Sequence, residues 1–168
     1  LEAEAIRDGM LSVSGKLNLK MGGRGFDFFN QRGGLSDYVP KQTFDAKGWR
    51  RMIYAHKVRM QSVDIFGAFD CPDAGQMKPR RTRSITPVQS LSLLNSPFAN
   101  RQAAFFSERV RREAGKDAAA QINLAFRLAC ARAPKSSEQQ ALQQLATEYG
   151  LEQACRVLFN TSAFLYLQ

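Results

Sequence analysis

The sequence has few of the residues from which metal and nucleophilic sites are built. Its 168 residues include one histidine, His56, and three cysteines, Cys71, Cys130 and Cys155, with no C-x-x-C pair. This argues against a zinc knuckle and a thioredoxin-like site, and it excludes the usual C-x-x-C-H attachment of c-type haem. It also excludes any site that needs two or three imidazoles. We therefore expect no cofactor and no metal in this chain, and we expect Cys130 and Cys155, which lie in apolar helical patterns, to be core residues.

Long apolar runs are also missing. No run approaches the roughly 20 residues that a membrane-spanning helix needs, and residues 1–4 are acidic where a secretory signal peptide would be basic. The chain opens without methionine and inside a helical pattern, so we expect a fragment of a longer protein. Hydrophobic residues make up 44% and charged residues 23%, which is typical of a folded globular domain. We expect one domain over residues 1–168, and the composition identifies no reaction.

Helical periodicity dominates both ends of the chain. It predicts helices over 1–14, from 86, over about 98–114, over 118–132, from 136 and from about 151. The segment Thr86-Pro87-Val88-Gln89 is a typical helix start, with a capping residue, proline at the first helical position and Gln three residues after the cap. Two apolar stripes are predicted to face the core: Ala99, Ala103, Phe106 and Val110, then Ala154, Cys155, Leu158 and Phe159.

The middle of the chain is less regular. Glycines punctuate residues 15–48, and the aromatic residues scattered among them are expected to anchor this segment to the body. Residues 49–60 partly alternate between apolar and polar, which favours a short strand, with a helix as the competing interpretation. The predicted fold is mainly α: a helical bundle-like domain with a looped, partly extended central insertion.

The positive charge is concentrated in the middle of the sequence. The chain has 24 Lys and Arg against 15 Asp and Glu, a net charge of +9, and residues 41–120 hold fifteen basic and seven acidic groups. Such a surface attracts phosphate, sulfate or carboxylate groups, and Trp49, Tyr54 and Phe66 lie nearby as stacking platforms. The alternative is that these charges form solvated faces and internal ion pairs. No nucleic-acid-binding motif is present, so a nucleic-acid partner is not expected.

The densest cluster of unusual residues follows Phe69. Asp70 and Asp73 stand three apart in a proline-bearing turn, and basic residues then precede the helix start at Thr86. In one interpretation, the favoured one, the carboxylates accept backbone N–H groups and arginine bonds and hold the loop rigid. In the other they form an acid/base or metal-binding pair facing an anion-binding arginine pair. The candidate binding residues are Asp70, Asp73, Arg80, Arg81, Arg83, Gln89 and Trp49.

Several motifs together resemble a planctomycete-type domain of unknown function numbered 1553. They are LEAEAIRD at the front, SGKL with a following GG, WRRMIY, FDCPDAGQ, RR-x-R-S-x-TP-x-Q-x-L-x-LLN, and the closing LFN-x-x-x-FLY, so the similarity covers nearly all of the chain. The resemblance implies the C-terminal part of a multidomain bacterial protein, exported to the periplasm or cell surface, often behind a cytochrome-c-like module. It implies no activity. Met77 stands where relatives commonly carry cysteine, and Cys71 where alanine is common, so no role of that loop cysteine carries over.

Three functions follow as expectations. The first is a non-catalytic binding or scaffolding module that recognises an anionic polysaccharide or a partner protein. The second is a hydrolase or lyase acting on an anionic saccharide, with Asp70 and Asp73 as acid and base and Arg80 as anion clamp. The third is a docking surface for a cytochrome-c-like domain of the same parent, which a positive charge would suit.

Overall fold

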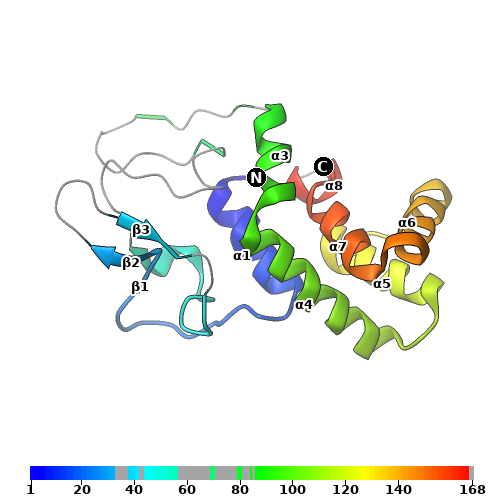
Figure 1. Cartoon of the computed structure of the whole chain (residues 1–168), viewed down its shortest axis with the longest axis horizontal. Helices are drawn as coiled ribbons and strands as arrows, with labels where there is room; N and C mark the ends of the chain where they lie inside the picture. The colour runs from blue at the N-terminus through cyan, green and yellow to red at the C-terminus, as the bar shows by residue number, and fades with distance from the viewer. Residues whose placement is uncertain are drawn as a thin grey trace.

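The computed structural model describes residues 1–32, 38–41, 44–56, 69–70, 79–80, 84 and 86–166. Within these residues the chain is mainly helical with a few short strands, which confirms the predicted fold class. Figure 1 shows the strands at one end of the molecule and α5, α6 and α7 at the other, with α1 and α4 between them. None of the helices described is both long and apolar enough to cross a membrane. The elements are α1 (Ala3–Val13), β1 (Phe26–Asp27), β2 (Phe29–Arg32), β3 (Tyr38–Pro40), the 3₁₀ helix η1 (Met52–Tyr54), β4 (Ala55–His56), α3 (Pro87–Asn95), α4 (Pro97–Ala114), α5 (Ala118–Cys130), α6 (Ser136–Tyr149), α7 (Leu151–Phe159) and α8 (Ser162–Leu165).

Local sequence signals set the helix ends. The predicted capping box at α3 is present, with the Thr86 N–H donating to Gln89 Oε1 at 3.3 Å. Ser96 separates α3 from α4, and its Oγ accepts from the Ala99 N–H, so Pro97 begins a new helix. Asp117 caps α5 in the same way. Short polar side chains here satisfy the amide groups that a helix start leaves unpaired.

Apolar stripes of the helices form the main core. We call α1 and α3 to α8 the helical bundle. Both predicted stripes are confirmed: every member is buried, and the rings of Phe106 and Phe159 stack with centroids 5.6 Å apart. α3 buries less of its apolar surface: Val88 and Leu91 are 60% and 59% exposed while Leu93 is buried. Because α3 lies at the edge of the bundle, against α4 and α7, only one side of it can be covered.

The glycine-rich segment forms the second region, which we call the loop lobe (the described residues of 15–56). β1 pairs in parallel with β4, and β2 pairs antiparallel with β3. The predicted strand over 49–60 is largely wrong for its described residues, because η1 occupies the middle and only Ala55–His56 pairs as β4. Residues 57–60 lie outside the described residues. The expected aromatic anchor is confirmed by a buried cluster: Phe26, Phe28, Phe29, Met52 and Ala3, with Phe44 packed against it.

Arg7 of α1 joins the two regions. Its side chain is almost completely buried, 2% exposed as a residue, and its guanidinium lies 5.0 Å from the ring centroid of Phe26 in the loop lobe and 5.3 Å from that of Phe98 on α4. Its Nη1 donates to the Arg50 carbonyl at 2.9 Å and its Nη2 to the Gly48 carbonyl at 2.5 Å. Burial lowers the pKa of Arg7 to about 10, although the adjacent Asp8 partly opposes this. A buried cation therefore holds the loop against α1.

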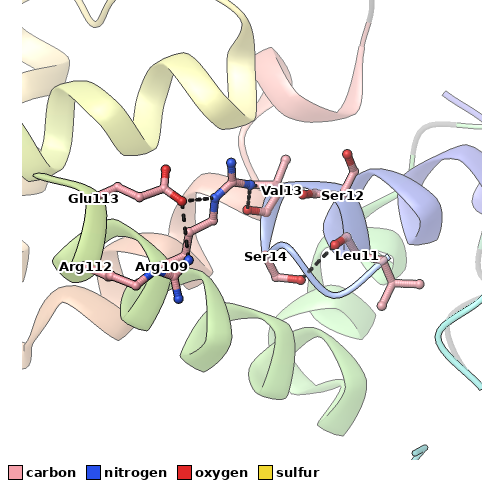
Figure 2. Close-up of polar contacts among 7 residues, drawn as sticks. All are labelled: Leu11, Ser12, Val13, Ser14, Arg109, Arg112 and Glu113. Atoms are coloured by element: carbon pink, nitrogen blue, oxygen red, sulfur yellow. Dashed lines mark hydrogen bonds and ion pairs between the residues drawn. The ribbon is translucent and has the colours of Figure 1, made fainter. Parts of the chain in front are cut away.

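A second arginine also donates to backbone carbonyls, at the C-terminal end of α1. The last turn of α1 contains no basic residue, and Arg109 of α4 donates instead to the carbonyls of Ser12 and Val13, at 3.2 and 2.9 Å. Figure 2 shows this guanidinium between Val13 and Glu113, which it meets at 2.9 Å. A positive group at a helix C-terminus satisfies its unpaired carbonyls and complements the helix dipole. Arg109 thus fixes α1 onto α4.

Candidate functional site

The start of α3 gathers two of the predicted site residues. Ser84 donates to Asp70 Oδ2 through its N–H at 2.6 Å and through its Oγ at 2.7 Å. Gln89 Nε2 in turn donates to the Ser84 carbonyl at 3.0 Å. Asp70 also has a positive φ of 52°, the left-handed conformation that Asp tolerates in tight turns. The chain Asp70–Ser84–Gln89 therefore fastens the preceding turn to the beginning of the helix.

The other predicted site residues are not all part of this hydrogen-bonded series. Arg80 is exposed, and Trp49 belongs to a different set of contacts, against α4. Asp73, Arg81 and Arg83 lie outside the described residues. Sequence reasoning missed Ser84, although its place two residues before the helix cap is the signal that could have identified it. Asp70 therefore accepts a backbone N–H, which is one of the two kinds of contact that the favoured interpretation predicts for it, and also accepts from a serine hydroxyl.

Trp49 lies in a cluster of rings and cations on the outer side of α4. Its ring meets Phe105 edge to face, with centroids 5.4 Å apart. Lys16 Nζ lies 4.4 Å from the Phe105 centroid and 5.9 Å from the Trp49 centroid, and the Arg101 guanidinium is 5.6 Å from Phe105. Trp49, Phe105 and Lys16 are half-buried and Arg101 is exposed. We call these four residues the aromatic–cation cluster.

Three different segments build the aromatic–cation cluster. Lys16 follows the Ser14-Gly15 end of α1, Trp49 precedes η1, and Arg101 and Phe105 stand one turn apart on α4. The position of Trp49 is fixed through its carbonyl, which accepts from the Asn18 N–H at 2.9 Å. Sequence reasoning found Trp49 alone. The i, i+4 spacing of Arg101 and Phe105, opposite the buried alanine stripe of α4, was the available signal for the rest.

Lys16 and Arg101 differ from three other cations of the protein, Arg7, Arg109 and Arg132, in their partners. Arg7, Arg109 and Arg132 each pair with a carboxylate. Within the described part of the chain, neither Lys16 nor Arg101 lies within ion-pair distance of a carboxylate. Cations beside aromatic faces attract both the rings and any anion that approaches. This arrangement is chemically suited to hold an anionic ligand that also has an apolar face.

The described residues offer little to covalent or metal chemistry. Burial raises the pKa of the Cys155 thiol to about 12 and also raises the pKa of Cys130, so neither thiol is a thiolate at neutral pH. His56 is exposed at the end of β4. Among the residues that the structure describes, no group of three or more His, Cys, Asp or Glu is placed to hold a metal ion.

Comparison with known protein families identifies the family of the chain. A family model described as "PSD1: Protein of unknown function (DUF1553)" matches residues 1–146. The match therefore covers the loop lobe and the bundle as far as α6, and ends before α7 begins at Leu151. No curated protein and no solved structure gives a significant match.

Proposed function

Since the chain belongs to the DUF1553 family, whose description assigns no activity, we propose from its own geometry that it is a non-catalytic binding module for an anionic polysaccharide. The observation that carries the proposal is the pair Lys16 and Arg101, which flank the Trp49 and Phe105 rings without a carboxylate partner among the described residues.

Sugar chemistry fits the aromatic–cation cluster. A pyranose ring presents a face of C–H groups that packs against an aromatic ring. A sulfate or uronic acid group on the same sugar carries the negative charge that Lys16 and Arg101 would neutralise. The cluster is partly exposed, so such a ligand can reach it without a conformational change. Arg80, also exposed, is a second cation that a long chain would contact.

The contacts of Asp70 support binding over catalysis. Its Oδ2 already accepts two hydrogen bonds from Ser84. A carboxylate that accepts hydrogen bonds is stabilised in its charged form and is a poor general acid. Hydrolysis or lysis by Asp70 and Asp73 is the alternative function, and the experiment below separates the two by looking for product.

Retention on an immobilised sulfated polysaccharide tests the proposal. We expect the chain to bind at low salt and to elute as salt is raised. The double variant Lys16→Gln/Arg101→Gln is expected to bind at least about tenfold more weakly, because two charge-assisted contacts are lost. The matched control is Lys116→Gln/Arg127→Gln, which removes the same charge from exposed positions of the bundle. A third variant, Arg80→Ala/Arg81→Ala, measures the contribution of the loop.

Three outcomes would overturn the proposal. The first is no retention at low salt, and the second is an equal loss of binding in the control variant. The third is release of shortened or unsaturated saccharide by the wild type but not by Asp70→Asn, which would establish the hydrolase or lyase instead.

The setting of the protein is part of the same proposal. Export to the periplasm or cell surface, and a cytochrome-c-like domain in the same parent, are proposed on the resemblance described above. The net charge of +9 would favour an acidic domain as a neighbour. Salt-sensitive binding of that isolated domain, with no retention on polysaccharide, would favour docking as the function.

A further inference from the structure

One loop of the loop lobe presents apolar side chains to solvent. Leu19 and Met21 are 71% and 85% exposed, and Ile53 on the neighbouring η1 is 79% exposed. Scattered exposed apolar residues are ordinary in proteins. These three differ because they stand on two segments that one set of hydrogen bonds connects.

Arg50 holds this loop in place. Its Nη1 donates to the Arg24 carbonyl at 2.8 Å, and its Nη2 donates to the carbonyls of Lys20 and Gly22 at 2.8 and 2.7 Å. Its guanidinium stacks 3.7 Å from the Tyr54 ring centroid, and Tyr54 Oη accepts from the Gly22 N–H at 2.9 Å. The backbone is therefore fixed on both sides of Met21 and next to Ile53. The exposed apolar side chains project from a built loop, which reduces the entropy cost of inserting them into another phase.

The residues around these apolar side chains are basic. Lys20 and Arg24 belong to the same loop and are exposed, and neither has a carboxylate at ion-pair distance within the described residues. Arg51, whose side chain is 60% exposed, precedes Met52 on the other segment and lies 3.9 Å from Asp8. Lys20 and Arg24 are therefore the cations without a carboxylate partner here, and apolar side chains beside such cations are the combination by which proteins bind anionic lipid surfaces.

We propose that the loop of residues 18–24, together with Ile53, docks on an anionic lipid bilayer. The apolar side chains enter the boundary between headgroups and acyl chains, and the nearby cations contact lipid phosphates. Charge complementarity selects this occupant. Val88 and Leu91 of α3 are similarly exposed, yet α3 contains no charged residue, so its apolar face has no such complement. The inference goes beyond the proposed function, which depends on Lys16 and Arg101.

Vesicle cosedimentation tests the inference with the whole chain. Vesicles of phosphatidylcholine alone are compared with vesicles that also contain phosphatidylglycerol, and the chain is expected to bind the anionic vesicles alone. The triple variant Leu19→Ser/Met21→Ser/Ile53→Ser is expected to lower the apparent partition coefficient at least about tenfold. The control Val88→Ser/Leu91→Ser, which removes apolar side chains of similar exposure, is expected to bind like the wild type. Circular dichroism verifies that each variant is folded.

A charge variant completes the test. Lys20→Gln/Arg24→Gln is expected to weaken binding to anionic vesicles several-fold and to reduce its dependence on salt. No binding of the wild type to anionic vesicles would overturn the inference, and so would equal losses in the α3 control. Retention on polysaccharide should be unchanged in the triple variant. If the triple variant loses both polysaccharide retention and vesicle binding, its loop lobe is damaged, and the single variants Leu19→Ser and Met21→Ser then decide. The inference expects each single variant to keep its far-UV spectrum and to bind vesicles more weakly.

Discussion

The helical bundle and the loop lobe satisfy their backbone hydrogen-bonding groups and hold their segments together in different ways. In the bundle, each helix pairs its own backbone groups, and apolar side chains such as Phe106 and Leu158, both fully buried, hold the helices together. In the loop lobe the strands are only two to four residues long, so much of the backbone has no ladder partner. Arg7 and Arg50 supply donors to five of its carbonyl groups.

This difference shows what a buried arginine can replace. A guanidinium carries five N–H donors in a fixed plane and can serve several carbonyls at once. Arg50 donates to three carbonyls of one loop. In a sheet, the N–H groups of a neighbouring strand would pair with such carbonyls. The cost is the burial of a charge, which the aromatic faces of Phe26 and Phe98 around Arg7 partly offset. The loop lobe therefore depends on a few side chains, whereas the bundle distributes its stability over many.

The largest effect should come from the bundle core. Phe106→Ala removes a fully buried ring that stacks on Phe159, and it is expected to lower the free energy of unfolding by about 3–5 kcal/mol. Chemical denaturation followed by circular dichroism measures this. If the two regions unfold cooperatively, the loop lobe should unfold in the same transition as the bundle. A separate unfolding transition of the loop lobe would show that the two regions are independent.

Arg7→Ala should destabilise the loop lobe more than the helical bundle. It leaves the carbonyls of Gly48 and Arg50 without their donor and Asp8 without its adjacent cation, so we expect a loss of about 3 kcal/mol. The loss should be concentrated in the loop lobe, where amide hydrogen exchange of residues 18–24 and 48–56 should become much faster than that of α4. Arg127→Ala, at an exposed position of α5, is the control and should change neither region. Uniform acceleration throughout the chain would contradict the assigned role of Arg7.

The two smallest effects should come from Gly25 in the loop lobe and Gly9 in the bundle. A side chain at Gly25 would overlap the Tyr54 carbonyl where β1 passes β4, so Gly25→Ala is expected to destabilise by about 1–3 kcal/mol. Gly9→Ala is the matched comparison in the bundle. Its new methyl group would meet Phe164 at 3.5 Å, an ordinary contact, and alanine favours the interior of α1, so a gain of about 0.5–1 kcal/mol is expected. Thermal unfolding measures whether each variant is more or less stable than the wild type. A change in the same direction for both variants would contradict the close approach of the backbone at β1.

Prediction from sequence succeeded where the signal was local. The capping residues Thr86 and Gln89 were identified, because a cap depends on residues three positions apart. The buried stripe through Phe106 was identified, because it follows the helical period. The candidate site was found in part: Asp70 and Gln89 do share a partner, but Ser84, Lys16, Arg101 and Phe105 were missed. Their association joins separate segments of the chain, and no periodic pattern marks such a contact.

The sequence by itself determined where most of the helices lie and which stripes α4 and α7 bury, since these depend on neighbours within one or two turns. The stripe that it predicted on α6 was only partly right, because Leu142 is buried whereas Tyr149 is 63% exposed. Only the tertiary structure decided what Arg7 and Arg50 bind. The Arg7 acceptors lie 41 and 43 positions away, and those of Arg50 lie 26 to 30 positions away. Every residue carries a carbonyl oxygen, so nothing in the residue types marks which ones a guanidinium will reach until the chain has folded around it.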